Sequence, residues 1–318
     1  MIVKERRMPI YLRQLEALLR RLPVHHPKRN IIAENIAKYK AGYKGERAVD
    51  YSLSFLPEQD YSILHDIRLF DQNHYFQIDT IIISPRFLLF LEIKNIVGTL
   101  LFDSTFNQLI RISEEKSEGF PDPILQMKRQ ELQLQKWLRL YGFSKFPIES
   151  FVVISTPRTV VKSSDDNLSN KIIHSANLPH KIKWLEIKYK KKTIYNINEL
   201  IQRMMMEHSP LQQNVLEKYQ MKKEELLKGV LCEECTSIPV VKVKKGWYCS
   251  KCNTVSKDAH KCALQDYALL IETVATNSKL KEFLNIQSSS IMKRILQLLK
   301  IPYIGENKGR KYDLTMYQ

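Results

Sequence analysis

The sequence predicts an α/β protein in which helices flank a mixed β-sheet, followed by a small four-cysteine module and a helical C-terminal segment. Three observations lead to this prediction. Apolar runs of strand length over 76–83 and 87–94 are rich in β-branched and aromatic residues. Helical patterns surround these runs, and another apolar run follows at 151–155, an order typical of a mixed sheet. Two Cys-x-x-Cys pairs over 232–252 stand apart from this pattern.

The composition indicates a folded protein with an anionic partner. The chain has 318 residues, of which 44% are hydrophobic, and it is long enough to divide into two or three units. Its formal net charge is +16, which favours nucleic acid as the partner. A membrane face or solubility alone would also explain a basic surface.

The sequence also indicates where the protein resides. No apolar stretch reaches the roughly 18 residues that a membrane span needs. The charged start, Lys4 to Arg7, is not followed by the apolar core of a signal peptide. Four of the five cysteines form Cys-x-x-Cys pairs, which fit metal binding in a reducing compartment better than disulfides. We therefore expect a cytoplasmic protein without membrane contact.

Helices are expected before the central strands. Leucines at helical spacing over 12–22 predict an amphipathic helix that docks on another surface. A second helix is expected near 31–41. Gly42 and Gly45 are then expected to interrupt the chain before a third helix, which carries Glu46.

The central block is expected to alternate strands with loops and one long helix. We expect strands near 61–67, 76–83, 87–94, 99–102 and 151–155, a polar loop over 103–122, and a helix from Pro123 to Leu140. Further along, 182–187 is expected to form a strand and 198–208 a helix, whereas the lysine run 188–192 is expected to be a solvated face. His65 and His74 are expected in turns or on the surface.

Charges on two apolar strands are the main functional signal. If 76–83 and 87–94 pair as a hairpin across Ser84-Pro85-Arg86, Glu92 and Lys94 lie on one side of their strand, where Asp79 can meet them. Two carboxylates and an ammonium at one sheet edge suit Mg²⁺, which prefers oxygen ligands. The alternative is a buried ion pair with a structural role, although such pairs seldom improve stability over apolar residues.

These residues carry a family resemblance. The segment Gly42-Tyr43-Lys44-Gly45-Glu46, with Gln77-Ile78-Asp79 and Glu92-Ile93-Lys94-Asn95, resembles the NERD family, the nuclease-related domain, within the PD-(D/E)XK nuclease superfamily. The resemblance covers roughly 40–155 and implies a restriction-endonuclease-like sheet. It implies that Asp79, Glu92 and the Ile93 carbonyl bind Mg²⁺ or Mn²⁺, while Lys94 serves the attacking water or the transition state.

Two further residues, Glu46 and Gln126, receive a role through this resemblance. Glu46 would supply a third carboxylate to the metal, although a glutamate in the first turn of a helix is also favourable by itself. Gln126 would bind a phosphate or the attacking water, or else lie on a plain helix surface. The family usually has Asn where this chain has Asp122, which is expected to cap the helix. Gln77 shares the strand face of Asp79 and is expected to support it.

The cysteine spacing predicts a zinc ribbon. Cys232-x-x-Cys235 and Cys249-x-x-Cys252 are separated by thirteen residues, which suits tetrahedral Zn²⁺ held by two knuckles on a hairpin. A redox role would need a thioredoxin-like context that the sequence does not offer. Such a small ribbon has little core of its own, so the metal is expected to supply its folding free energy. Cys262 is expected to be a core residue of a helix.

The C-terminal segment resembles a winged helix-turn-helix. Two short amphipathic patterns, 278–286 and 291–299, flank a polar turn, and a basic stretch follows. We expect base or groove contacts from Ser288, Ser289, Lys293 and Arg294, and phosphate contacts from Lys308, Arg310 and Lys311. A helical hairpin that contacts other proteins is the alternative.

These inferences combine into one prediction. The expected division is a helical segment 1–40, a nuclease-like domain 41–225, a zinc ribbon 226–257 and a DNA-binding domain 258–318. The expected activity is that of a deoxyribonuclease dependent on Mg²⁺ or Mn²⁺, in DNA processing or repair, without a small-molecule cofactor. One alternative is a nucleic-acid-binding or regulatory protein with a vestigial nuclease centre. Another is an assembly scaffold that uses the N-terminal amphipathic helix.

Overall fold

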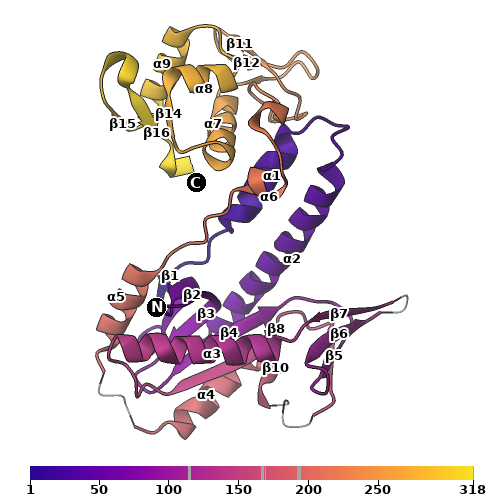
Figure 1. The fold of residues 1–318 in the computed structure, drawn as a ribbon, viewed down its shortest axis with the longest axis vertical. Coiled ribbons are helices and arrows are strands. Elements are labelled where there is room, and N and C mark those ends of the chain that lie inside the picture. The colour runs from indigo at the N-terminus through magenta and orange to yellow at the C-terminus, as the bar shows by residue number, and fades with distance from the viewer. Residues whose placement is uncertain (114–115, 166–167, 169, 192–194, 318) are drawn as a thin grey trace. The chain divides into compact units, whose positions relative to one another are not determined.

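The computed structural model describes residues 1–113, 116–165, 168, 170–191 and 195–317, and it divides into two compact units (Figure 1). The first unit consists of Met1–Arg7 and Lys40–Leu211, and the second of Met8–Tyr39 and Gln212–Gln318. Each unit thus combines an N-terminal segment with a later one. The four consecutive domains expected from the sequence stay a prediction.

The elements alternate as an α/β fold requires, which confirms the predicted fold class. The helices are α1 (Ile10–Arg21), α2 (Arg29–Leu53), α3 (Pro123–Leu140), α4 (Leu178–Lys188), α5 (Ile197–Glu207), α6 (Val215–Lys218), α7 (Ala259–Leu270), α8 (Asn277–Phe283) and α9 (Ser289–Leu298). The strands are β1 (Ile2–Lys4), β2 (Ser62–Phe70), β3 (Tyr75–Ile83), β4 (Leu88–Lys94), β5 (Thr99–Asp103), β6 (Gln108–Ile112), β7 (Ser117–Pro121), β8 (Ile148–Ile154), β9 (Val160–Ser163), β10 (Ile172–His174), β11 (Val241–Val243), β12 (Gly246–Tyr248), β13 (Val255–Ser256), β14 (Val274–Thr276), β15 (Tyr303–Ile304) and β16 (Lys311–Asp313).

The first unit is built on a mixed sheet with the order β1–β2–β3–β4–β8–β10. Strands β2, β3 and β4 are antiparallel, so the predicted hairpin is confirmed, whereas β1, β8 and β10 join in parallel. Helix α3 covers one face through Leu134 and Trp137. The end of α2 and helix α4 cover the other face through Val49 and Ile182.

Alternation along β4 assigns its side chains to the two faces. Leu88 and Phe90 belong to the core under α3, while Leu89 and Leu91 belong to the core under α2 and α4. Because strand side chains alternate, Glu92 falls on the α3 face with Leu88 and Phe90. The chain therefore places an acid in a fully apolar row, as its sequence pattern indicated.

A second sheet of the first unit corrects the expected loop over 103–122. Strands β6 and β7 lie in that segment and pair with β5 and β9 in the order β7–β6–β5–β9. Most of their side chains are exposed or half-buried. A ribbon with so little burial needs no apolar run, which is why the sequence pattern did not reveal it.

Two further predictions, one of a helix break and one of a strand, were also wrong. Helix α2 runs without a break through Gly42 and Gly45, where we expected two helices. The segment 182–187 is part of α4, because Ile182 and Leu185 pack on the sheet at helical spacing. The predicted helices over 123–140 and 198–208 and the predicted strand at 151–155 are confirmed by α3, α5 and β8.

The second unit encloses two neighbouring cores. In one, the apolar face of α1 packs against α7, and Leu12, Leu15 and Leu18 are fully buried. The predicted docking of this amphipathic helix is therefore satisfied within the unit. In the other core, Cys249 and Trp247 of the cysteine module pack with residues of α7, α8 and α9.

Two small antiparallel sheets complete the second unit. One has the order β11–β12–β13 and carries the cysteine pairs at its ends, and the other has the order β14–β16–β15. Within the described residues, none of the helices combines the length and the apolar character that crossing a membrane requires.

Candidate functional site

The strands β3 and β4 separate where their acidic residues lie. Their ladder runs from Ile83↔Leu88 to Thr80↔Leu91 and ends before Asp79 and Glu92 would face each other. Instead, the Asp79 carboxylate accepts a hydrogen bond from the backbone N–H of Ile93 at 2.8 Å. The carboxylate thus bridges the end of the ladder and is fixed without an ion pair.

A chain of hydrogen bonds on the α3 face holds Glu92. Lys94 Nζ donates to Glu92 Oε1 at 2.7 Å and to Gln126 Oε1 at 3.2 Å. The second oxygen of Glu92 accepts from Gln130 Nε2 at 3.0 Å. Glu92 is only 3% exposed, so these partners compensate for the loss of water around its charge. Gln126 and Gln130 are one turn apart on α3, which places both amides over the end of β4.

Glu46 approaches the same region from α2. Gly45 makes this approach possible, because a Cβ atom there would lie 2.2 Å from Asn95 Cβ and 2.7 Å from Ser155 Oγ. The amide of Asn95 also donates to the carbonyl of Ala41 on α2 at 2.6 Å. The glycine in the middle of α2 therefore serves close packing of the helix on the strand ends.

The buried Arg6, from the segment after β1, connects Glu46 to the sheet. Its guanidinium donates to Glu46 Oε2 at 2.8 Å, to Thr80 Oγ1 at 2.8 Å and to both oxygens of Asp50. Its side chain is only 3% exposed. A fork of donors in fixed geometry thereby holds the carboxylates of α2 against β3.

The same guanidinium fixes His65. Arg6 Nη2 lies 2.9 Å from His65 Nδ1, and since a guanidinium only donates, this nitrogen accepts. Burial, and then the charges of Arg6 and Lys4, lower the pKa of His65 to about 3. His65 is therefore neutral at physiological pH. The expectation that it lies in a turn or on the surface was wrong, since it is 2% exposed within β2, whereas His74 is exposed.

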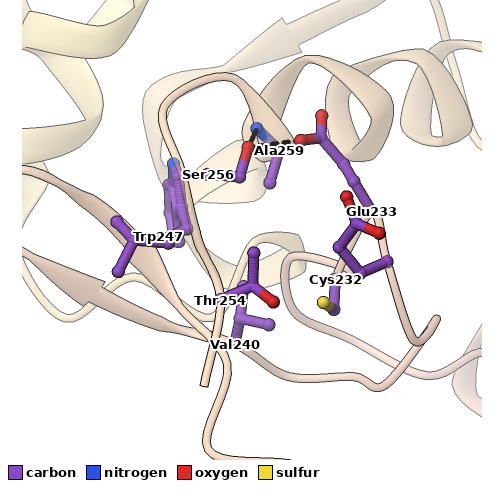
Figure 2. Close-up of a pocket in the computed structure, with 9 residues that line it drawn as sticks. Cys232, Glu233, Val240, Trp247, Thr254, Ser256 and Ala259 are labelled. Atoms are coloured by element: carbon purple, nitrogen blue, oxygen red, sulfur yellow. Dashed lines mark hydrogen bonds between the residues drawn. The ribbon is translucent and has the colours of Figure 1, made fainter. Parts of the chain in front are cut away.

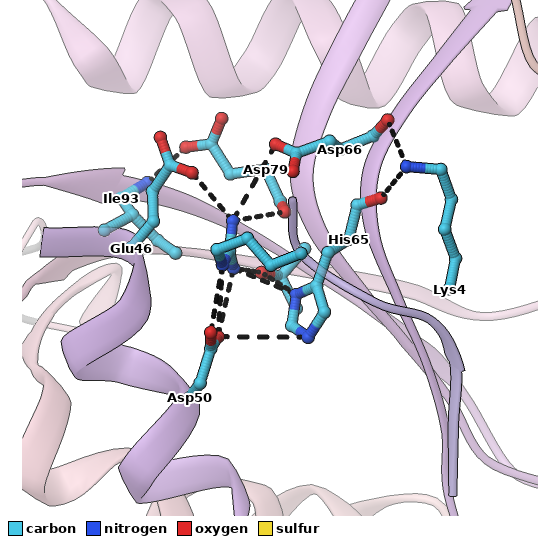
Figure 3. A network of polar contacts seen from close by, with 9 residues as sticks. Lys4, Glu46, Asp50, His65, Asp66, Asp79 and Ile93 are labelled. Atoms are coloured by element: carbon cyan, nitrogen blue, oxygen red, sulfur yellow. Dashed lines mark hydrogen bonds and ion pairs between the residues drawn. The ribbon is translucent and has the colours of Figure 1, made fainter. Parts of the chain in front are cut away.

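Burial and neighbouring carboxylates raise the pKa values of Asp79 and Glu46. Burial, and then the carboxylates of Glu92 and Glu46, raise the pKa of Asp79 well above its ordinary range. Burial, and then Asp66, raise the pKa of Glu46 to about 7, against the opposing effect of Arg6. In Figure 3 the side chains of Glu46 and Asp79 point toward one region. We call Glu46, Asp79, Glu92 and Lys94 the carboxylate centre.

The donor set of this centre fits a hard divalent cation. It offers carboxylate oxygens, and a bound cation would offset the repulsion by which Glu92 and Glu46 raise the pKa of Asp79. However, the described residues hold only one group of three or more His, Cys, Asp or Glu side chains with all ligand atoms within 4.8 Å, and that group is the four cysteines. The three carboxylates thus lie near one another without forming a compact ligand shell.

Gln77 has a different place from the one expected. Its side chain is exposed, and its contact with the centre is through its backbone carbonyl, which accepts from Gln130 Nε2 at 2.9 Å. The sequence analysis did not assign a role to Gln130 or Arg6. A glutamine one turn after Gln126 was a usable signal for the first. An arginine in a short N-terminal segment gave no signal for the second.

The four paired cysteines, which we call the cysteine centre, come together as predicted. Cys232 Sγ lies 3.5 Å from Cys252 Sγ, and Cys235 Sγ lies 3.5 Å from Cys249 Sγ. All four sulfur atoms lie within 4.8 Å of one another and none forms a disulfide. Tetrahedral zinc with bonds of about 2.3 Å separates its sulfur ligands by about 3.8 Å, so the cluster fits structural zinc.

Residues of the cysteine module and Ala259 of helix α7 line a small cavity of about 120 Å³ (Figure 2). Ser256 on its wall donates to the Glu233 carboxylate, and its Oγ accepts from the backbone N–H of Asp258 and Ala259 at 3.2 and 3.1 Å. Trp247 on the same wall donates to His260 Nδ1 at 3.1 Å. The start of α7 is thus fixed by residues of the module. Cys262 on α7 lies outside the cysteine centre.

The C-terminal elements follow the order helix, strand, helix, helix, strand, strand from α7 to β16. Ser288 caps α9 through Ile291, and Ser289, Lys293 and Arg294 are exposed on that helix. Lys311 is exposed on β16.

Of the remaining two residues of the expected basic wing, Arg310 contacts an aromatic ring. The guanidinium of Arg310 lies 4.1 Å from the ring centre of Tyr303, so this residue is partly engaged within the chain. The side chain of Lys308 lies outside the described residues. Among the wing cations with described side chains, Lys311 is exposed and Arg310 is half-buried.

Comparison with known protein families gave a match within the first unit. Residues 41–155 match the family model of the nuclease-related domain, NERD, which confirms the resemblance and is consistent with the PD-(D/E)XK superfamily. Neither the curated proteins nor the solved structures gave a match. The matched range includes the carboxylate centre and Gln126, and it excludes Arg6 and the cysteine centre. This chain therefore carries a nuclease-related domain over residues 41–155.

Proposed function

We propose that the protein is a nuclease that hydrolyses phosphodiester bonds of DNA with the help of Mg²⁺ or Mn²⁺. The observation that carries the proposal is the convergence of Glu46, Asp79, Glu92 and Lys94 at the diverging ends of β3 and β4. Glu46, Asp79 and Glu92 would hold the cation. When bound, such a cation stabilises charge that develops on a phosphate.

The protein's own groups would orient the substrate. Lys94 keeps its ammonium beside Glu92, where it can neutralise charge on a phosphate oxygen. Because Lys94 engages the oxygen of the Gln126 amide, the NH₂ end of that amide is turned away from Lys94 and can donate to a phosphate or a water. Gln130 holds the second oxygen of Glu92 and fixes its carboxylate plane.

The second unit would bind nucleic acid. The order of elements from α7 to β16 supports a winged helix-turn-helix, in which α9 would enter the major groove. Ser289, Lys293 and Arg294 are exposed on α9, and Lys311 is exposed in the wing. Arg310 and Lys308 belong to the same proposal, and Ser288 would act mainly by capping α9. The cysteine centre would hold structural Zn²⁺.

One observation favours the non-catalytic alternative, a nucleic-acid-binding protein with a vestigial centre. The three carboxylates do not form a compact ligand group among the described residues, and Arg6 engages Glu46. The scaffold alternative has less support, because the apolar face of α1 is covered within its own unit.

The test is cleavage of single-stranded, duplex and branched DNA, and of RNA, with Mg²⁺ or Mn²⁺. Asp79→Asn and Glu92→Gln should each lower the rate by about a hundredfold or more, because each removes a ligand charge while keeping the shape. Asp103→Asn, which changes a half-buried acid of the second sheet in the same unit, should leave the rate unchanged. DNA binding without cleavage by the wild type would establish the alternative instead.

A further inference from the structure

The segment that precedes the matched domain contributes a side chain to the carboxylate centre. Strand β1 pairs in parallel with β2, with Ile2 beside Ile63 and Lys4 beside Leu64. This pairing brings Arg6 behind the ends of β3 and β4, although Arg6 lies outside the matched residues 41–155. Contacts group residues 1–7 with the first unit as well.

We infer that Arg6 is a positioning residue for the proposed nuclease reaction, and that residues 1–7 are part of the functional nuclease unit. The inference rests on the proposed function. The guanidinium donates to Glu46 Oε2 at 2.8 Å and lies 3.4 Å from the carbonyl oxygen of Asp79. It therefore touches one proposed metal ligand by its side chain and another by its backbone.

The other partners of Arg6 explain why it is held so firmly. Its remaining donors meet Asp50, His65 and Thr80, and its Nη1 lies 3.7 Å from Asp66 Oδ1. Asp66 has a φ of 52°, a strained conformation for an aspartate. Lys4 Nζ also donates to the carbonyl oxygens of His65 and Asp66, at 2.7 and 3.3 Å. A network that fixes one guanidinium from several sides suits a group that orients others.

Charge counting supports the same role. The region holds five carboxylates, on Glu46, Asp50, Asp66, Asp79 and Glu92, and three cations, on Lys4, Arg6 and Lys94. With His65 neutral and all five acids ionised, the state that a bound cation favours, the formal excess is two negative charges, which one divalent cation balances. Arg6 pairs with Asp50 and Asp66, so the uncompensated negative charge is that of the acids at the ends of β3 and β4.

Arg6 has two opposing effects on a bound metal: its charge repels the cation, and its hydrogen bonds orient the ligands. The two effects predict different changes in metal affinity and in turnover. The positive charge of Arg6 repels a cation, so removing it should not weaken metal binding. Its fork of donors orients Glu46 and the Asp79 backbone, so removing it should disturb the geometry that turnover needs. A positioning role thus predicts lost turnover with retained metal affinity, whereas a role in folding alone predicts loss of both together.

The experiment compares Arg6→Lys and Arg6→Gln with the exposed neighbour control Arg7→Lys, all in the full-length zinc-loaded protein. Cleavage at saturating Mn²⁺ gives turnover, and electron paramagnetic resonance of free Mn²⁺ gives the dissociation constant. Arg6→Lys should lower turnover by about ten- to a hundredfold. Its Mn²⁺ dissociation constant should stay within about threefold of the wild type, and Arg6→Gln should bind Mn²⁺ at least as tightly. Arg7→Lys should change neither quantity.

Three results would overturn the inference. Turnover of Arg6→Lys within about threefold of the wild type would show that the fork of donors is not needed. Parallel loss of turnover and Mn²⁺ binding, or failure of Arg6→Lys to fold, would assign Arg6 to stability. Failure of the proposed function is recognised separately: the wild type would then not cleave, and Asp79→Asn would bind Mn²⁺ as the wild type does.

Discussion

The carboxylate centre lies on a sheet with apolar cores on both faces, whereas the cysteine centre joins strands of three residues or fewer. In the first, Leu88, Phe90, Leu89 and Leu91 hold β4 in place whether or not a metal is bound. In the second, Cys232 and Cys249 are themselves core residues. The comparison teaches that a ligand can be supported by the fold or can be part of what holds the fold.

The two centres also differ in ligand chemistry. In the carboxylate centre, burial and the carboxylates of Glu92 and Glu46 raise the pKa of Asp79, and Glu92 accepts hydrogen bonds from Lys94 and Gln130. The thiols of the cysteine centre lie close together, and hydrogen bonds from Ser237 lower the pKa of Cys235 to about 6. Oxygen ligands with free positions suit catalysis, and four thiolates leave no open position. Function is therefore expected at the first centre and stability at the second.

The largest effect is expected when a cysteine ligand is removed, because the metal is then lost from a module that it holds together. Cys249→Ser should abolish zinc binding, whose apparent free energy in small zinc modules is on the order of 10–16 kcal/mol. That is comparable with the whole stability of about 5–15 kcal/mol of a typical domain, so 230–256 should lose structure. Because this segment shares a core with α7, α8 and α9, those helices should lose protection from hydrogen exchange too.

Cys262→Ser is the matched control, since Cys262 is half-buried on α7 and is not part of the cysteine centre. It should keep one zinc per chain by elemental analysis and should keep the exchange protection of the wild type. A wild-type protein that holds no stoichiometric zinc and still unfolds cooperatively would contradict the idea that the metal supports this unit.

The next largest effect is expected at the carboxylate centre, and it should be an effect on rate. Lys94→Met removes the ammonium that lies beside Glu92 but keeps the length of the side chain. Cleavage should fall by on the order of 10²–10³-fold, because a preorganised charge at the phosphate is lost. The melting temperature should change little, since the sheet cores are untouched.

Lys162→Met, which changes an exposed lysine on β9 of the same unit, is the control for lost positive charge. It should retain the wild-type rate. If Lys94→Met cleaves as fast as the wild type, the activity belongs to another site or to a contaminating nuclease.

A smaller effect tests whether the amide behind Glu92 matters. Gln130→Leu removes the donor that lies 3.0 Å from Glu92 Oε2 and 2.9 Å from the carbonyl of Gln77. The rate should fall by about ten- to a hundredfold, as for residues that orient ligands. The free energy of unfolding should fall by about 1–3 kcal/mol, because two buried acceptors lose their partner. Gln135→Leu, on the same helix and half-buried, should change the rate little; an equal loss in both variants would point to damage to α3.

The sequence predicted those parts of the molecule in which residue type and spacing alone indicate the structure. Acids inside apolar strands indicated the carboxylate centre, and cysteine spacing indicated the other. The paired strands β3 and β4 followed from β-branched runs and a proline turn. Each of these signals is local and strong enough to be independent of tertiary context.

What sequence did not predict depends on contacts between distant segments. Arg6 lies in a short segment whose role arises only when β1 pairs with β2. The sequence around Gly45 predicts a helix break. Only the close contact with Asn95 and Ser155 explains a glycine inside helix α2. The ribbon of β6 and β7 is too exposed to need an apolar pattern, and the β-branched residues of 182–187 belong to a helix because their partners are on the sheet. In each case tertiary context outweighs local propensity.

The smallest effect is expected for the proposed DNA contacts of the second unit. These contacts lie on elements that share a core with the cysteine module. Lys311→Gln should weaken binding on all duplexes and lower the slope of log affinity against log salt by about 0.9.

Arg294→Ala should instead cost about 1–3 kcal/mol on a preferred site and little elsewhere, if its guanidinium reads a base. Lys222→Gln, an exposed lysine of the same unit, is the control. Point substitutions are needed here, because deleting the C-terminal helices would remove half of a shared core. Unchanged slopes in both variants, measured by fluorescence anisotropy, would mean that α9 and the wing form a protein-contact surface.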